Sequence, residues 1–174
     1  RNYTTVKMNA VLMNVALQLN KEFPNLKLTY LDANFPFYDG FPLLPHLSHN
    51  DGKKVDISFI YMDESNHLTN LKPSNSGYGI FEEPLQNEIH QTTICKEKGY
   101  WQYDFTKFLT FGSRDNIKLS PKTTKKLIEL LVKNKEVSKI FIEPHLKSRL
   151  KINNSKLRFH GCKAVRHDDH IHFQ

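Results

Sequence analysis

The stretch Arg166-His167-Asp168-Asp169-His170-Ile171-His172-Phe173 decides how this 174-residue chain is expected to fold. Three histidines and two aspartates fall within six positions, and one apolar residue separates the last two histidines. Side chains alternate between the two faces of a β-strand, so His170 and His172 are expected on one face, roughly 6.6 Å apart. Ile171 and Phe173 then point to the opposite face. The stretch therefore predicts a strand that presents two imidazoles to one side of a sheet.

A second polar cluster, Pro45-His46-Leu47-Ser48-His49-Asn50-Asp51-Gly52-Lys53-Lys54-Val55-Asp56, lies far upstream. A catalytic zinc site needs three nitrogen or oxygen ligands from the protein and one open position. His49, Asp56 and one histidine of the C-terminal stretch satisfy that count. We therefore predict that the two clusters form one divalent metal site.

A metal ion held in this way lowers the pKa of a bound water to about 7 and polarises a carbonyl group. A neighbouring side chain must then accept the proton of the water and pass it to the leaving amine. His170 is placed for that task, since it shares a strand face with His172. Four of the nine histidines are expected to have no catalytic role: His67, His90, His145 and His160.

Length and composition predict a single domain over residues 1–174, since 39% hydrophobic and 25% charged residues are typical of globular proteins. The chain opens with Arg1, so we expect a processed or truncated product. No apolar run approaches the roughly 18 residues that span a bilayer, so no membrane span is expected. Cys95 and Cys162 form either one disulfide or two free thiols, and their spacing leaves both open.

The net charge of +7 favours a polyanionic partner, such as nucleic acid, anionic lipid or an anionic wall polymer. No nucleic-acid-binding motif accompanies the basic residues, so nucleic acid is not expected as a partner.

Hydrophobic periodicity predicts a mixture of helices and strands without regular alternation, which favours the α+β class. Trp101–Phe111 is either a short helix or a strand, and 64–99 is expected to cross the surface without much regular structure. The loop 32–45 contains three prolines and is expected to be long and ordered. The expected helices are Met8–Phe23, Pro121 to about Lys135 with Ser120 as N-cap, and Pro144–Leu150; the expected strands are Leu26–Leu31, Val55–Met62, Ser138–Glu143 and the C-terminal stretch.

The two clusters together resemble the penicillin-insensitive murein endopeptidases. The resemblance is carried by Pro45-His46-Leu47-Ser48-His49 with Gly52 and Val55-Asp56, and by His167-Asp168-Asp169-His170-Ile171-His172. The segment 127–150 is also similar. These enzymes belong to the zinc peptidases that include lysostaphin, D-alanyl-D-alanine carboxypeptidases and the hedgehog domain. The resemblance implies the fold of that group, a small antiparallel sheet that carries the zinc site and is flanked by helices.

The resemblance also implies an activity and a set of roles. The enzyme would use one zinc ion per chain to hydrolyse peptide cross-links of peptidoglycan, in the periplasm, the cell envelope or outside the cell. His49, Asp56 and His172 would be the zinc ligands, and His170 would take the place of a catalytic base. The residues implied to line the cleft are His46 and His167, which would position or stabilise the tetrahedral intermediate, with His167 counted among the catalytic residues. For Asp168 and Asp169 we leave two readings open, a residue of the cleft that orients a histidine or a solvated turn carboxylate.

Two other functions are kept open. A D-alanyl-D-alanine carboxypeptidase would trim a terminal residue, and would need a closed pocket with a basic anchor for the free carboxylate. A catalytically inactive module would keep the zinc and bind the wall or another protein. The set of His167, His170 and His172 argues against that module, because a purely structural zinc site is normally closed by a fourth ligand. The sequence leaves the oligomeric state open.

Overall fold

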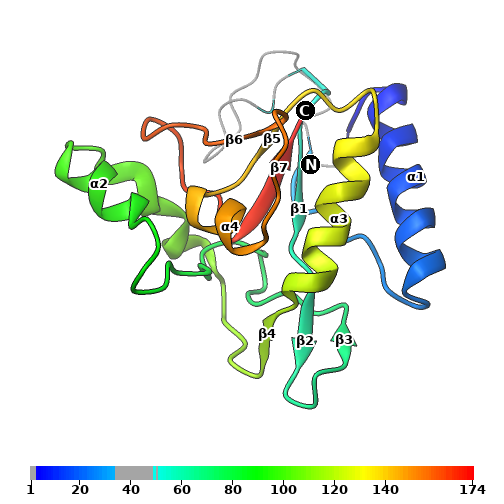
Figure 1. Ribbon diagram of the computed structural model, residues 1–174, viewed down its shortest axis with the longest axis horizontal. Helices are drawn as coiled ribbons and strands as arrows, with labels where there is room; N and C mark the ends of the chain where they lie inside the picture. The colour runs from blue at the N-terminus through cyan, green and yellow to red at the C-terminus, as the bar shows by residue number, and fades with distance from the viewer. Residues whose placement is uncertain (1–2, 34–48, 50) are drawn as a thin grey trace.

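The computed structural model describes residues 3–33, 49 and 51–174, and it combines helices with two small β-sheets (Figure 1). This confirms the α+β class. The helices are α1 (Val6–Glu22), α2 (Gln91–Glu97), the 3-10 helix η1 (Trp101–Leu109), α3 (Pro121–Lys133) and α4 (Pro144–Arg149). The strands are β1 (Val55–Ser58), β2 (Tyr61–Asp63), β3 (Leu68–Thr69), β4 (Ile117–Leu119), β5 (Ile140–Phe141), β6 (Leu157–Arg158) and β7 (His170–Phe173).

The larger sheet has the strand order β1-β7-β5-β6, so the C-terminal strand lies inside the sheet. Strand β7 is antiparallel to both β1 and β5, as expected for a small antiparallel sheet. Strand β6 differs, because it runs parallel to β5. The physical reason is the connection: α4 lies between β5 and β6 in the chain, and such a crossover returns the chain in the same direction. The smaller sheet has the order β3-β2-β4.

Helices α1 and α3 pack against each other beside β1 (Figure 1). Thr5 caps α1, since its side chain accepts a hydrogen bond from the Met8 amide at 3.2 Å. Helix α3 begins with Pro121 after Ser120, as predicted, and ends at Lys133. The buried apolar faces of both helices join the strands in one core, whose largest fully buried side chains include Leu19, Leu127, Leu131, Ile140, Ile171 and Phe173.

The predicted strand Val55–Met62 is divided into β1 and β2, which belong to different sheets. At the break, the Ile60 amide donates to the Thr124 hydroxyl at 3.1 Å, and the Ile60 carbonyl accepts from the Ser120 amide at 2.8 Å. The start of α3 thus replaces the strand partners at this point. Periodicity cannot show such an exchange, because it depends on a segment more than 60 residues away.

The segment Leu26–Leu31 is not a regular strand, although it lies along β1. The amides of Leu31 and Ser58 donate to Asp56 and Thr29, at 2.7 and 2.9 Å, and Asp56 donates to Asp32 at 2.8 Å. The backbone of Asp56 is therefore held on this side by Leu31 and Asp32, while β7 pairs with β1 on the other. Most of the predicted loop 32–45 lies outside the described residues.

The remaining segments surround the larger sheet. Trp101–Leu109 is a 3-10 helix, and the polar region 64–99 contains β3 and α2. A disulfide joins Cys95 of α2 to Cys162, in the segment between β6 and β7. None of the helices in the described part of the chain is long and apolar enough to cross a bilayer.

Candidate metal centre

His49, Asp56 and His172 come together in the interior, and this group can hold a metal ion. Asp56 of β1 lies directly opposite His172 of β7 in the strand register, and His49 approaches from the chain before β1. The Nε2 atom of His49 lies 3.3 Å from Oδ1 of Asp56 and 3.2 Å from Nδ1 of His172. The His172 nitrogen lies 2.9 Å from the same Asp56 oxygen. All three side chains are almost completely buried.

These three distances suit a metal site. Zinc binds imidazole nitrogen and carboxylate oxygen at about 2.0–2.1 Å, so neighbouring ligands of a tetrahedral site lie about 3.3 Å apart. The donor set of two nitrogens and one oxygen is the set that catalytic zinc sites use, with one further position left for water or substrate. The predicted ligands are therefore assembled as a metal ion would require.

The hydrogen bond of His49 supports the same conclusion. Its Nδ1 atom lies 2.8 Å from the Ala33 carbonyl, which can only accept, so Nδ1 carries the proton. In the neutral ring, Nε2 then directs a lone pair at Asp56 and His172. A backbone carbonyl behind a metal-binding histidine commonly fixes the tautomer in this way. Lone pairs that converge on a carboxylate within a buried site favour a cation between them.

The pKa values of His49 and His172 are shifted by burial and by the charged groups beside them. Burial opposes the charged form of His49, but the attraction of Asp56 outweighs it, so the pKa of His49 is raised. Burial lowers the pKa of His172, and the neighbouring His49 and His170 add to this effect. His172 therefore favours the neutral form that binds metal ions.

His170 lies on the same face of β7 as His172, while Ile171 and Phe173 point into the core, as the alternation predicted. Its Nδ1 atom makes a short contact with Oδ1 of Asp169. The other Asp169 oxygen accepts the Gly79 amide at 2.7 Å. Asp169 thus orients the imidazole, with Nε2 of His170 lying 3.8 Å from Oδ2 of Asp56.

Burial also opposes the charged form of His170, but Asp169 and Asp56 outweigh it and raise its pKa to about 9. A cation bound by Asp56 would offset the part of this shift that comes from Asp56. The arrangement can hold or release a proton at Nε2 beside the candidate metal ligands, which is what a general acid or base requires.

Tyr78 also contacts this centre, and the sequence analysis did not identify it. Its hydroxyl donates to Oδ2 of Asp56 at 2.9 Å, and its ring meets the ring of His170 edge to face, with centroids 5.0 Å apart. Burial and the neighbouring Asp56 raise the pKa of Tyr78 well above its usual value, so the phenol remains a donor. The sequence Gly77-Tyr78-Gly79, an aromatic residue between two glycines in a polar region, is the signal that could have drawn attention to it.

Five aromatic rings form a wall at the candidate metal centre, those of Phe141, His160, His167, His170 and His172. The rings of His167 and His170 have centroids 4.9 Å apart, and those of His167 and His172 are 5.6 Å apart. His160 stacks on Phe141 at 4.1 Å and lies 5.1 Å from His167. His160 was expected to be unrelated to catalysis, yet the structure places it next to two of the candidate site residues.

Asp168 has different partners from Asp169. Its carboxylate binds the guanidinium group of Arg166, which also lies over the Phe81 ring. Glu143, the residue before α4, accepts hydrogen bonds from the Tyr103 hydroxyl at 2.7 Å and from the His167 amide at 3.0 Å. These buried groups hold segment 166–169, which leads into β7, against η1 and the start of α4. They thereby fix the backbone that carries His167 and His170.

The other histidines are scattered. His67 is exposed in the β2–β3 turn, and His90 precedes α2. The Nε2 atom of His145 donates to the Glu82 carbonyl, 2.7 Å away, and lies 3.6 Å from Asp168. The predicted cleft residue His46 lies outside the described residues.

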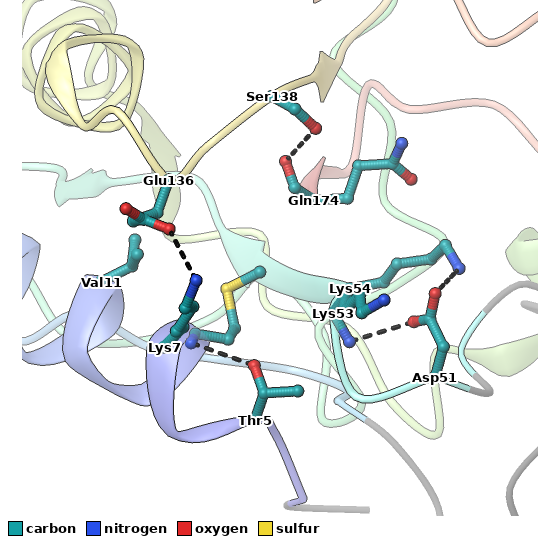
Figure 2. Close-up of a pocket in the computed structure, with 10 residues that line it drawn as sticks. Thr5, Lys7, Val11, Asp51, Lys53, Lys54, Glu136, Ser138 and Gln174 are labelled. Carbon is teal, nitrogen blue, oxygen red and sulfur yellow. Dashed lines mark hydrogen bonds and ion pairs between the residues drawn. The ribbon is translucent and has the colours of Figure 1, made fainter.

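A hollow of about 420 Å³ lies elsewhere, at the start of α1 (Figure 2). Its walls come from the first turn of α1, the turn before β1 and the segments after α3 and β7. Lys54 binds Asp51 at 2.9 Å, and Lys7 lies 3.9 Å from Glu136. The charged side chains that line this hollow are largely paired with one another. We therefore place the candidate chemistry at the group of His49, Asp56 and His172 instead.

No known protein-family model matches the sequence, and no curated protein matches it either.

Proposed function

We propose that this protein is a zinc-dependent peptidase that hydrolyses the peptide cross-links of peptidoglycan, in the manner of a murein endopeptidase outside the cytoplasm. The observation that carries the proposal is the buried triangle of His49, Asp56 and His172, with His170 and Asp169 beside it. The donor set suits catalytic zinc, and a proton-transfer pair lies within reach of it. The motif resemblance supplies the choice of substrate, and the net charge of +7 suits an anionic wall polymer.

Zinc held by these ligands would supply Lewis-acid chemistry, which acidifies water and polarises the carbonyl of the cleaved amide. The chain itself would provide the proton transfer. His170 would accept at Nε2 a proton from the water whose oxygen bonds to the carbonyl carbon. It would then deliver that proton to the amide nitrogen as the C–N bond breaks, so that the products are a carboxylate and a free amine. Asp169, fixed by the Gly79 amide, would hold the ring in position and stabilise its charged form. His167 would contact the reacting groups from the same wall.

The first test is the metal content of protein purified without added metal, measured by elemental analysis beside digestion of isolated peptidoglycan with and without chelator. We expect about one zinc per chain and release of cross-linked peptides that a chelator abolishes. Zinc without release would favour an inactive binding module. Release of terminal D-alanine alone would favour a carboxypeptidase. A protein without metal would contradict the proposal.

Two substitutions separate the roles of the histidines. His172→Ala is expected to lose both zinc and activity, because it removes one of three ligands. His170→Ala is expected to retain zinc and lose activity by at least about 100-fold, the usual effect of removing a general base. His67→Ala, at an exposed histidine of the β2–β3 turn, serves as the matched control and should resemble the wild type. Loss of zinc from His170→Ala would instead make His170 a ligand.

A further inference from the structure

His160 extends the row of residues that forms the candidate site across the larger sheet. Asp56 pairs with His172 in the strand register, His172 pairs with Phe141, and Phe141 pairs with Arg158. Residues directly opposite each other in neighbouring strands share a face. His160 lies two residues beyond Arg158, and its ring stacks on Phe141. The metal face of the sheet therefore continues over Phe141 to His160.

His160 differs from the other imidazoles of the wall in its exposure. His167, His170 and His172 are buried, whereas His160 is exposed. Its ring stacks on Phe141 at 4.1 Å with only 22° between the planes, and its centroid lies 5.8 Å from that of His172. His160 thus stands at the rim of the site, next to its deepest residues.

The stacking fixes the orientation of the His160 ring without using its nitrogen atoms. Neither ring nitrogen makes a hydrogen bond to the part of the chain that the structure describes. An imidazole keeps at least one N–H donor in either protonation state. Binding sites commonly combine an apolar wall with a few such oriented polar groups, which determine how the ligand lies.

We infer that His160 is a substrate-binding residue, which donates a hydrogen bond to a backbone carbonyl oxygen of the peptide bound on the β6 side of the site. The inference rests on the proposed peptidase function. It assigns a substrate contact to His160, which lies outside the two sequence motifs that carry the resemblance. Phe141 serves as the platform for the ring. A peptide that crosses the sheet from His172 toward β6 would meet His160 next.

The test compares His160→Phe with His160→Gln on a purified cross-linked muropeptide dimer. Phenylalanine keeps the stack on Phe141 but has no donor, while glutamine restores a donor. Loss of one hydrogen bond of this kind is expected to raise KM about tenfold in His160→Phe, with little change in kcat. His160→Gln should recover most of that loss. Zinc content and the thermal midpoint should remain as in the wild type, as should KM in the control His67→Phe.

Two results would overturn the inference. A wild-type KM in His160→Phe would show that only the stack matters. Loss of zinc or of thermal stability in that variant would show a structural role instead.

Binding of the same dimer, measured by calorimetry on zinc-loaded His170→Ala with and without His160→Phe, separates the two proposals. If the wild type cleaves nothing but the dimer still binds about tenfold more weakly without His160, the peptidase proposal fails and the contact stands. No dependence on His160 in this assay would overturn the contact, whatever the activity.

Discussion

The hydroxyl of Tyr78 and the amide of Gly79 each hold one carboxylate of the candidate site, Asp56 and Asp169 respectively. Two consecutive residues thus position a candidate metal ligand and the partner of the proposed base. Such second partners orient the groups that touch the metal, and they affect its affinity without touching it.

Tyr78→Phe removes the hydrogen bond to Oδ2 of Asp56 while keeping the aromatic ring against His170. We expect zinc affinity to fall about 10- to 100-fold, since loss of a partner of a metal ligand typically has this effect. Competition with a chelating dye measures the affinity. Tyr30→Phe, at a half-exposed tyrosine, is the matched control. Equal affinity in wild type and Tyr78→Phe would mean that Asp56 is held without this bond.

Gly79→Ala places a Cβ atom 2.3 Å from the Thr106 carbonyl oxygen, at a residue whose φ of +82° already disfavours side chains. Backbone cannot move aside cheaply, so we expect unfolding free energy to fall by at least about 2 kcal/mol in urea titrations. Gly99→Ala is the control, because its φ is +87° and its Cβ would meet nothing within 4 Å. It should cost only about 1 kcal/mol, and equal losses would show that the contact with Thr106 is relieved.

Among the elements, α4 connects the site to the polar region before α2. Its first residue follows Glu143, which binds Tyr103 and the His167 amide. Its last residue, Arg149, binds the Glu88 carboxylate, with Nε lying 3.0 Å from Oε1. The helix is short, so these contacts at its two ends determine where it lies.

The ion pair of α4 predicts a dependence of stability on pH. Hydrogen bonds from Arg149 lower the pKa of Glu88 from 4.5 to about 2. Because the pKa is lower in the folded protein, the pair stabilises the fold fully above about pH 4.5, and this contribution disappears as pH falls toward 2. Glu88→Gln should therefore lower the unfolding free energy by about 1 kcal/mol at pH 7, allowing for solvent screening.

The difference between wild type and Glu88→Gln should shrink as unfolding is repeated from pH 5 down to about pH 2. Glu97→Gln, at an exposed glutamate of α2, provides the comparison. A difference that stays constant over this range would show that Glu88 acts through packing and not through its charge.

At the scale of the whole molecule, the sheet joins parts of the chain that are far apart. His49 and His172 are separated by 123 residues, and they meet because β7 inserts between β1 and β5. The disulfide between Cys95 and Cys162 closes a second long loop of 67 residues, which includes η1, α3, α4 and β6. The segment that follows Cys162 leads directly into the histidine wall.

The double variant Cys95→Ala/Cys162→Ala is expected to lose about 4 kcal/mol of unfolding free energy, the loop-closure entropy for a bridge of this span. Denaturant unfolding measures the loss, and adding a reductant should lower the stability of the wild type to a similar value. The reductant should leave the double variant unchanged. A wild type that is insensitive to reductant would contradict a stabilising bridge between the two cysteines.

The sequence by itself determined the local features of this protein. Alternation along 170–173 placed both histidines on one face of β7, and the start of α3 followed from Ser120 and Pro121. The ligand group of His49, Asp56 and His172 was also assembled as predicted. The first two features follow from residue spacing within one element, where the geometry of a strand or a helix turn is nearly fixed. The three candidate ligands were named from their residue types, but they meet only because β7 pairs with β1.

Only the tertiary structure decided the features that depend on distant partners. The disulfide between Cys95 and Cys162 is one such feature. Others are contacts of carboxylates, in which Asp169 binds His170, Asp168 binds Arg166, and Asp56 accepts a hydrogen bond from Tyr78. The tertiary structure also divided Val55–Met62 between two sheets and stacked His160 on Phe141. The physical reason is common to all of them. Spacing along the chain determines on which face of its own helix or strand a side chain lies. Which residue it then contacts depends on how separate elements pack.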